Sequence, residues 1–81
     1  MTTTQIKKEI FEVLIHMGLP LQALTEKACF QKDLGLDSLD FAELVMEFEY
    51  RFNVELPILE MEKVTTIRAA IGYLNQRLSN N

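Results

Sequence analysis

The chain has few of the residues that cross-link or interrupt a fold. Its single cysteine, Cys29, excludes an internal disulfide, so nothing indicates a secreted, disulfide-held scaffold. Glycine (3 residues) and proline (2 residues) are scarce, which favours helices. No apolar run approaches the roughly 20 residues that span a bilayer, and the start Met1–Gln5 lacks the pattern of a signal peptide. We therefore expect a cytoplasmic protein that does not insert into a membrane.

Length and charge narrow the possibilities further. A chain of 81 residues, of which 48% are hydrophobic, suits one small globular domain, so we expect a single domain over residues 1–81. The net charge of −4 argues against a protein that binds the phosphate backbone of nucleic acid. We expect no nucleic-acid partner and a monomeric chain.

Apolar residues recur at helical spacing in the first and second thirds of the chain. The first helix is expected over residues 3–17, between a threonine run that can cap it and Gly18, which can end it. The segment from there to Leu36 has no regular period, so we expect a long loop. Four of its apolar side chains should fold back on the core: Leu21, Leu24, Phe30 and Leu34. A second helix is expected from Asp37 to about Phe52.

The last third contains one short and one long helical stretch. Pro57 interrupts the pattern, and residues 58–63 can form no more than a turn or two. Thr65 or Thr66 can then cap a last helix. Its apolar stripe consists of Ile67, Ile71, Leu74 and Leu78. The sequence predicts an all-α four-helix bundle, with three main helices, one short helix and a long loop after the first helix.

The second helix has two unlike faces. At about 100° per residue, its core face contains Phe41, Leu44, Val45, Phe48 and Phe52. The opposite face contains Leu39, Met46 and Tyr50, interleaved with Asp40, Glu43 and Glu47. These apolar residues are either scattered surface residues, or packed against the long loop, or part of a docking strip. We favour the docking strip, on which carboxylates steer basic partners and apolar side chains add brief contacts.

The start of this helix draws attention to one serine. Asp37 suits the N-cap position, and Asp40 stands where a capping box places an acid. Capping assigns a role to Asp37 and Asp40 but none to Ser38, whose hydroxyl would be exposed in the first turn of the helix. A phosphate ester on that hydroxyl would lie beside unpaired backbone N–H groups and the positive end of the helix dipole. Ser38 is therefore the candidate attachment site, and we assign Asp37 to capping and partner contact.

The stretch from Asp33 to Asp40, D-L-G-L-D-S-L-D, resembles the attachment motif of stand-alone acyl carrier proteins. The resemblance extends through E-L-V-M at residues 43–46, then Phe52, Pro57 and V-T-T-I at residues 64–67. It covers nearly the whole chain, is dense from residue 30 to residue 74, and its D-S-L core is specific in this helical context. For the fold, the resemblance implies a four-helix bundle whose core can open to enclose an acyl chain.

The resemblance also implies a function. The serine at position 38 would bear a 4′-phosphopantetheine arm, transferred from coenzyme A by a phosphopantetheinyl transferase, and the arm's thiol would carry acyl groups as thioesters. The chain itself would be non-catalytic. Its partners would be acyl synthases, reductases, dehydratases or acyltransferases with basic docking patches. The implied docking residues are Asp37, Leu39, Asp40, Glu43, Met46 and Glu47.

Some positions depart from a housekeeping fatty-acid carrier. Ile58 and Leu59 follow Pro57 where such carriers have acids, and Arg51 stands in a stretch that is usually acidic. The second helix also has unusual aromatic bulk, contributed by Phe41, Phe48 and Tyr50. Rings near a chain-binding cavity would shorten or reshape it, unless they are ordinary core variation. A carrier dedicated to a specialised lipid or polyketide pathway and a housekeeping carrier both remain open.

Other readings of the chain have less support. His16 is the only histidine and is expected to be a half-buried or surface helix residue, so no hydrolase triad is indicated. Cys29 is expected to be a small buried residue, and no metal site is predicted. Two alternatives stay open. One is an amino-acyl or peptidyl carrier, and the other is an unmodified helical protein-interaction module.

Overall fold

The computed structural model describes residues 1–79, and helices dominate them. The elements are α1 (Thr3–His16), the short 3-10 helix η1 (Leu21–Ala23), α2 (Ser38–Phe52), α3 (Ile58–Met61) and α4 (Ile67–Ser79). The β-structure of the described residues consists of one isolated antiparallel bridge between Cys29 and Thr66. The predicted all-α bundle of three main helices and one short helix is confirmed.

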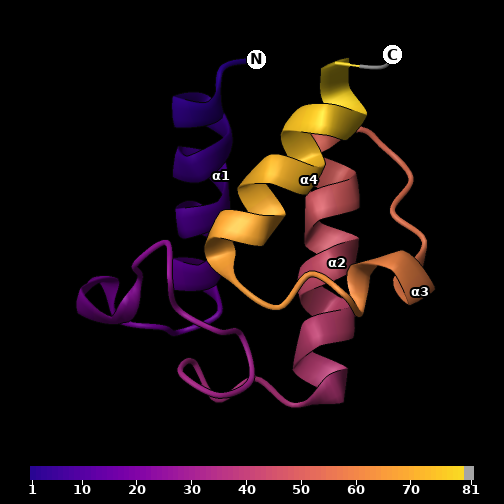
Figure 1. The fold of residues 1–81 in the computed structure, drawn as a ribbon. Helices are drawn as coiled ribbons and strands as arrows, with labels where there is room; N and C mark the ends of the chain where they lie inside the picture. The colour runs from indigo at the N-terminus through magenta and orange to yellow at the C-terminus, as the bar shows by residue number, and fades with distance from the viewer. Residues whose placement is uncertain (80–81) are drawn as a thin grey trace.

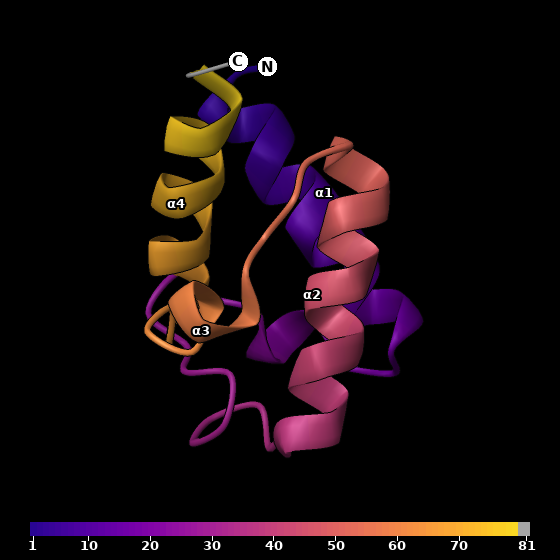
Figure 2. The same cartoon turned by 90° about the vertical axis from the view of Figure 1, so that its right-hand side faces the viewer.

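Three long helices form the body of the molecule (Figures 1 and 2). α1 packs on both α2 and α4, and α3 packs on α2. α1 and α2 run in opposite directions, and the long loop between them crosses the end of the bundle that lies away from the chain termini. This arrangement places the start of α2 beside that loop and near α3.

Local capping explains where the helices begin and end. Thr2 caps α1 through a bond from the N–H of Gln5 to its Oγ1 at 3.1 Å, and Gly18 takes a positive φ of 97° just after the helix ends. Asn53 ends α2 in the left-handed conformation, with φ 53°. Thr66 is the residue that caps α4, because its Oγ1 accepts the N–H of Ala69 at 3.0 Å.

The predicted apolar faces meet in one core. The buried helical side chains include Ile6, Ile10, Val13 and Leu14 of α1, the five predicted residues Phe41, Leu44, Val45, Phe48 and Phe52 of α2, and Ile67, Ile71 and Leu74 of α4. Leu78 is half-buried against this core. The helical period therefore assigned these faces correctly.

Two predictions for the long loop were wrong. Leu24, Phe30 and Leu34 are buried as expected, but Leu21 is 60% exposed. Leu21 opens the 3-10 turn η1, and the chain reaches the core at the end of that turn, through the half-buried Ala23 and the buried Leu24. Cys29 is half-buried instead of buried. At this point the loop is extended and pairs with the start of α4, and side chains on an extended backbone alternate between two sides.

The pairing itself is short. The N–H of Phe30 donates to the carbonyl of Thr65 at 2.9 Å, and the N–H of Ile67 donates to the carbonyl of Ala28 at 3.1 Å. Because Ala28 and Phe30 both point into the core, Cys29 between them faces the other way.

Candidate functional site

The site begins at the first turn of α2. Asp37 Oδ1 accepts the N–H of Asp40 at 2.8 Å, and Asp40 Oδ2 accepts the N–H of Asp37 at 3.2 Å, so the predicted capping box is present. Ser38 follows as the first helical residue and is exposed. Within residues 1–79 the Ser38 hydroxyl makes no hydrogen bond. The N–H groups of Ser38 and Leu39 lie in the first turn, where a helix offers them no partner of its own.

The chain before Ser38 is held in place by a compact turn. Leu34 and Leu36 are buried, and Gly35 between them takes a φ of 70°, which favours glycine. The Asp33 carboxylate accepts the N–H of Cys29 at 2.7 Å and closes the turn on its other side. The two buried leucines therefore fix the direction in which α2 starts and the serine points.

Ser38 borders a cavity of about 500 Å³. Three segments line it: residues Cys29, Phe30, Gln31 and Lys32 of the loop, residues Ser38, Phe41 and Ala42 of α2, and residues Ile58, Glu62, Val64 and Thr65 from α3 onward. Its inner wall is apolar and its polar lining residues include the serine. A group attached at Ser38 therefore has an adjacent hollow in which an apolar chain finds contacts.

Only part of the aromatic bulk predicted to reshape the cavity lies against it. Phe41 lines the cavity and packs on Phe30, with ring centroids 5.7 Å apart and planes at 55°. Phe48 is fully buried in the core and packs on Phe52 at 6.1 Å, and Tyr50 is 86% exposed. Phe41 is thus the α2 ring that bounds the cavity.

Five of the six predicted docking residues lie with Tyr50 on a surface that we call the α2 strip, which consists of Leu39, Asp40, Glu43, Met46, Glu47 and Tyr50. The sixth, Asp37, is exposed at the N-cap just before the strip. Leu39 is 68% exposed and Met46 is 66% exposed, so this face does not pack against the long loop. Glu43 and Glu47 are exposed as well, and Asp40 is half-buried by its capping role. Solvent-facing apolar side chains alternating with carboxylates are typical of a surface that binds basic partners.

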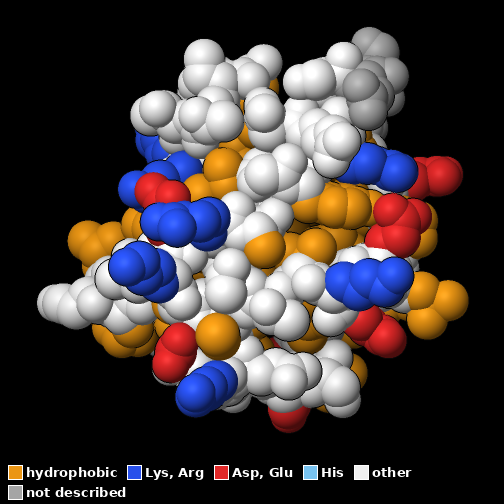
Figure 3. Space-filling model, viewed as in Figure 1, with side chains coloured by type: hydrophobic (Ala, Val, Ile, Leu, Met, Phe, Trp, Pro, Cys, Tyr) orange, Lys and Arg blue, Asp and Glu red, His pale blue; other side chains and the backbone are white. Residues whose placement is uncertain are grey.

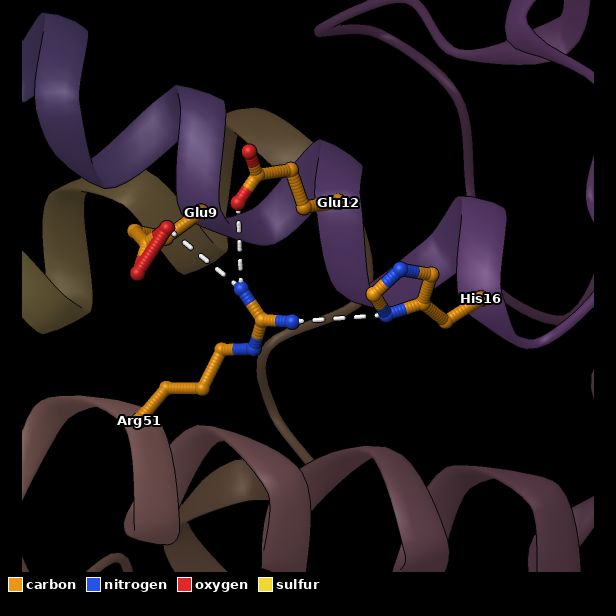
Figure 4. A network of polar contacts seen from close by, with 4 residues as sticks. All are labelled: Glu9, Glu12, His16 and Arg51. Carbon is orange, nitrogen blue, oxygen red and sulfur yellow. Dashed lines mark hydrogen bonds and ion pairs between the residues drawn. The ribbon is translucent and has the colours of Figure 1, made fainter.

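Sequence reasoning missed the partners of Arg51. Its Nη1 donates to Glu12 at 3.1 Å and to Glu9 at 3.4 Å, both on α1, and its Nη2 lies 3.4 Å from Nδ1 of the exposed His16 (Figure 4). Hydrogen bonds with Glu9 and then with Arg51 lower the pKa of Glu12. Arg51 therefore links α2 to α1 and turns its charge away from the α2 strip. The one-turn spacing of Glu9 and Glu12 was the available signal.

α3 forms one wall of the cavity and is held by α4. The Tyr73 hydroxyl donates to Glu60 at 2.8 Å, and the Arg77 guanidinium donates to the carbonyl of Glu55 just before α3. Burial, together with the Glu60 carboxylate, raises the pKa of Tyr73. Ile58 and Leu59 are exposed, and Figure 3 shows apolar side chains reaching the surface at the right-hand edge, where α3 lies in Figure 1.

Within residues 1–79, no group of three or more His, Cys, Asp or Glu side chains is placed to hold a metal ion. In the same part of the chain, none of the helices combines the length and apolar character that crossing a membrane requires.

The chain is similar to a known family and to known proteins. Residues 8–74 match the family described as "Phosphopantetheine attachment site". The chain is 39% identical over 75 residues to a protein named "Acyl carrier protein" from Chlorobium phaeobacteroides, and the match covers 91% of this chain and 96% of that relative.

Proposed function

This chain belongs to the acyl carrier proteins, which bear a covalent 4′-phosphopantetheine group, and from that premise we propose that Ser38 is the residue to which the group is attached. We infer one carrier domain over residues 1–81, acting in the cytoplasm as a non-catalytic monomer. When bound, the arm supplies a thiol that carries acyl groups as thioesters. The chain's own residues present the arm and shelter its cargo.

The observation that carries the assignment is the position of the Ser38 hydroxyl. It is exposed, at the start of a capped helix and at the edge of the apolar cavity. The unpaired N–H groups of the first turn suit the negative charge of a phosphodiester. The chain's other serine, Ser79, lies in the last turn of α4 and donates its hydroxyl to the carbonyl of Asn75 at 2.8 Å. The C-terminal end of a helix, where Ser79 lies, does not favour an anion.

We propose that partner enzymes dock on the α2 strip together with Asp37. These partners are a phosphopantetheinyl transferase and acyl synthases, reductases, dehydratases or acyltransferases with basic patches. The strip supports this assignment because it is exposed and acidic, and because Arg51 is held by α1. Exposed carboxylates steer a basic surface and add little to the stability of the free protein.

We propose fatty-acid, specialised lipid or polyketide biosynthesis as the pathway. The apolar surface of α3, at Ile58 and Leu59, and the ring of Phe41 in the cavity wall support a specialised carrier with its own partners. The amino-acyl or peptidyl carrier is the second candidate. The cavity favours the acyl carrier, because the inner wall formed by Phe30, Phe41 and Val64 suits an apolar chain.

The attachment site is tested by intact mass. After incubation with coenzyme A and a broad-specificity phosphopantetheinyl transferase, the wild-type chain and Ser79→Ala should each gain one arm, and Ser38→Ala should gain none. The pair is matched, because each variant removes one hydroxyl. An unmodified wild-type chain would favour the protein-interaction module that needs no arm.

The docking surface is tested by charge reversal. Glu43→Lys should raise the KM of the transferase for the carrier by about two- to fivefold, since an exposed ion pair is worth up to roughly 1 kcal/mol. The helicity of the Glu43→Lys carrier should equal that of the wild-type chain. Glu55→Lys, an equal charge change outside the strip, is the control. Equal KM values for the two variants at low salt would contradict electrostatic docking on α2.

A further inference from the structure

A phosphate ester at Ser38 would lie among carboxylates. Asp37 precedes the serine, Asp40 follows it by two residues, and both carboxylates accept backbone N–H groups in the capping box. A phosphodiester adds a further negative charge, and like charges this close repel one another. The positive end of α2 supplies only about half a charge against them. A cation near the serine would therefore stabilise the phosphate of the arm.

The cavity beside α2 brings one cation to the same place as the serine. Lys32 and Ser38 both line it, and among the lining residues, which all belong to residues 1–79, Lys32 is the only cation and Glu62 the only carboxylate. Lys32 is exposed, and its loop runs beside the start of α2 (Figures 1 and 2). The serine and the lysine thus share one opening to solvent.

The ion pairs within residues 1–79 use other basic side chains. Lys7 and Arg68 both contact Glu26, and Arg51 is held by two carboxylates of α1. Lys32 takes no part in these pairs. Its ammonium group is available to an anion that is attached at the edge of the cavity.

The backbone that carries Lys32 is held in a compact turn. The N–H groups of Asp33 and Leu34 both donate to the carbonyl of Cys29 at 3.0 Å, and the N–H of Gly35 donates to the carbonyl of Gln31 at 3.1 Å. This turn leads directly into α2. Pairing with a phosphate therefore orders the flexible stem of the lysine and leaves the backbone as it is.

We propose that Lys32 binds the phosphate of the 4′-phosphopantetheine arm through its ammonium group. The inference rests on the proposed attachment of the arm to Ser38. A lysine suits this role, because its ammonium is a compact charge with three donors and can meet a phosphate without a fixed orientation. The pair holds the root of the arm at the edge of the cavity, and so favours the arm over the cavity instead of over the α2 strip.

The proposal is tested by ³¹P NMR on chains whose loading with the arm is first confirmed by intact mass. The resonance of the phosphodiester should move in Lys32→Gln, and Lys32→Arg, which keeps the charge, should stay closer to the wild type. Raising the NaCl concentration from about 20 mM to about 0.5 M should move the wild-type resonance toward that of Lys32→Gln, because salt screens an exposed pair. At low salt the pair should be closed up to about five times as often as it is open.

Two further spectra locate the contact. In ¹⁵N spectra of the lysine ammonium groups, the Lys32 signal should be sharper in the loaded chain than in the chain without the arm, because hydrogen bonds to the phosphate slow the exchange of its protons with water. The amide shifts that the arm causes at residues 29–32 and 62–65 should be smaller in Lys32→Gln. Amide shifts away from the cavity should equal those of the wild type, which shows that the variant is folded.

Lys27→Gln is the matched control, because Lys27 is exposed in the same loop and does not line the cavity. It should leave the ³¹P resonance and the arm-induced amide shifts as they are in the wild type.

Two results would overturn the proposal. One is the same ³¹P resonance in wild type and Lys32→Gln at low salt. The other is a Lys32 ammonium signal equally sharp with and without the arm, which would mean that a group of the chain itself, such as Glu62, holds the lysine. Neither result bears on whether Ser38 carries the arm, since mass is measured first, so failure of the lysine contact and failure of the carrier assignment are distinguishable.

Discussion

The hydrogen bond between Tyr73 and Glu60 should control how firmly α3 closes the cavity. α3 is a single turn of helix, Ile58–Met61, too short to be stable by itself, so contacts with the rest of the fold must hold it. One anchor is Met61, which is buried, and another is Glu60, which accepts the Tyr73 hydroxyl at 2.8 Å. Tyr73→Phe removes the second anchor and leaves the ring in place.

The expected loss follows from the position of this bond. The acceptor of the Tyr73 hydroxyl is a carboxylate, but the bond lies at the surface. Removing it should therefore lower the free energy of unfolding by about 0.5–1.5 kcal/mol. A loss of about 1 kcal/mol changes an opening equilibrium roughly fivefold. Amide hydrogen exchange of residues 58–64 should therefore accelerate by about that factor under conditions where exchange reports the opening equilibrium. Denaturant unfolding should show a similar free-energy loss.

The pH dependence provides a second signature of the same bond. The fold raises the pKa of Tyr73 above its ordinary value of 10.0, so the folded state favours the neutral phenol. That contribution is fully present below pH 10 and is lost as the pH rises from 10 through the raised pKa. Tyr73→Phe should lose less stability over this alkaline range than the wild type.

Tyr50→Phe is the control, since it makes the same chemical change on an 86% exposed residue. It should leave exchange in α3 unchanged. The reasoning would be refuted if Tyr73→Phe and Tyr50→Phe had the same effect on residues 58–64.

Three further predictions concern the start of α2, the turn before it and the contact of the long loop with α1. Asp37→Ala removes the N-cap of α2 and should lower the free energy of unfolding by about 1 kcal/mol in a denaturant titration; no measurable loss would contradict the capping role. Gly35→Ala should cost about 1 kcal/mol or more in the same titration, because its φ of 70° disfavours a side chain, and a neutral effect would show that the turn adapts. Glu26 has a lowered pKa, chiefly from its hydrogen bond with Lys7, so its contribution is present above pH 4.5 and is lost as the pH falls through the lowered value. Lys7→Met should therefore show a shallower loss of stability in acid than the wild type, and an identical acid profile would exclude this pair as a cause.

The helices and their caps were predictable because the signals are local. The period of the α2 sequence identified its buried face, and Asp37 and Asp40 are within one turn of each other. The exposure of Leu39 and Met46 also followed from that period. The candidate attachment residue needed no knowledge of contacts between distant parts of the chain.

The errors and omissions concern contacts between residues far apart in sequence. Arg51 lies 39 residues from Glu12, and a charge pattern does not reveal which helices will pack together. Cys29 was misplaced because the alternation that turns it outward depends on pairing with Thr66, beyond α2 and α3. A groove of about 350 Å³ that residues of α1 and α2 line was not predicted for the same reason, since it exists only once the two helices are packed.

Tryptic peptide mass mapping of the chain after loading with coenzyme A and a transferase tests the central claim most directly. Cleavage after Lys32 and Arg51 releases residues 33–51, in which Ser38 is the only hydroxyl-bearing side chain apart from Tyr50. We expect the whole mass of one phosphopantetheine on this peptide, with fragment ions that place it at Ser38. An arm on any other peptide, or on Tyr50, would contradict the claim that the first turn of α2 is built to receive it.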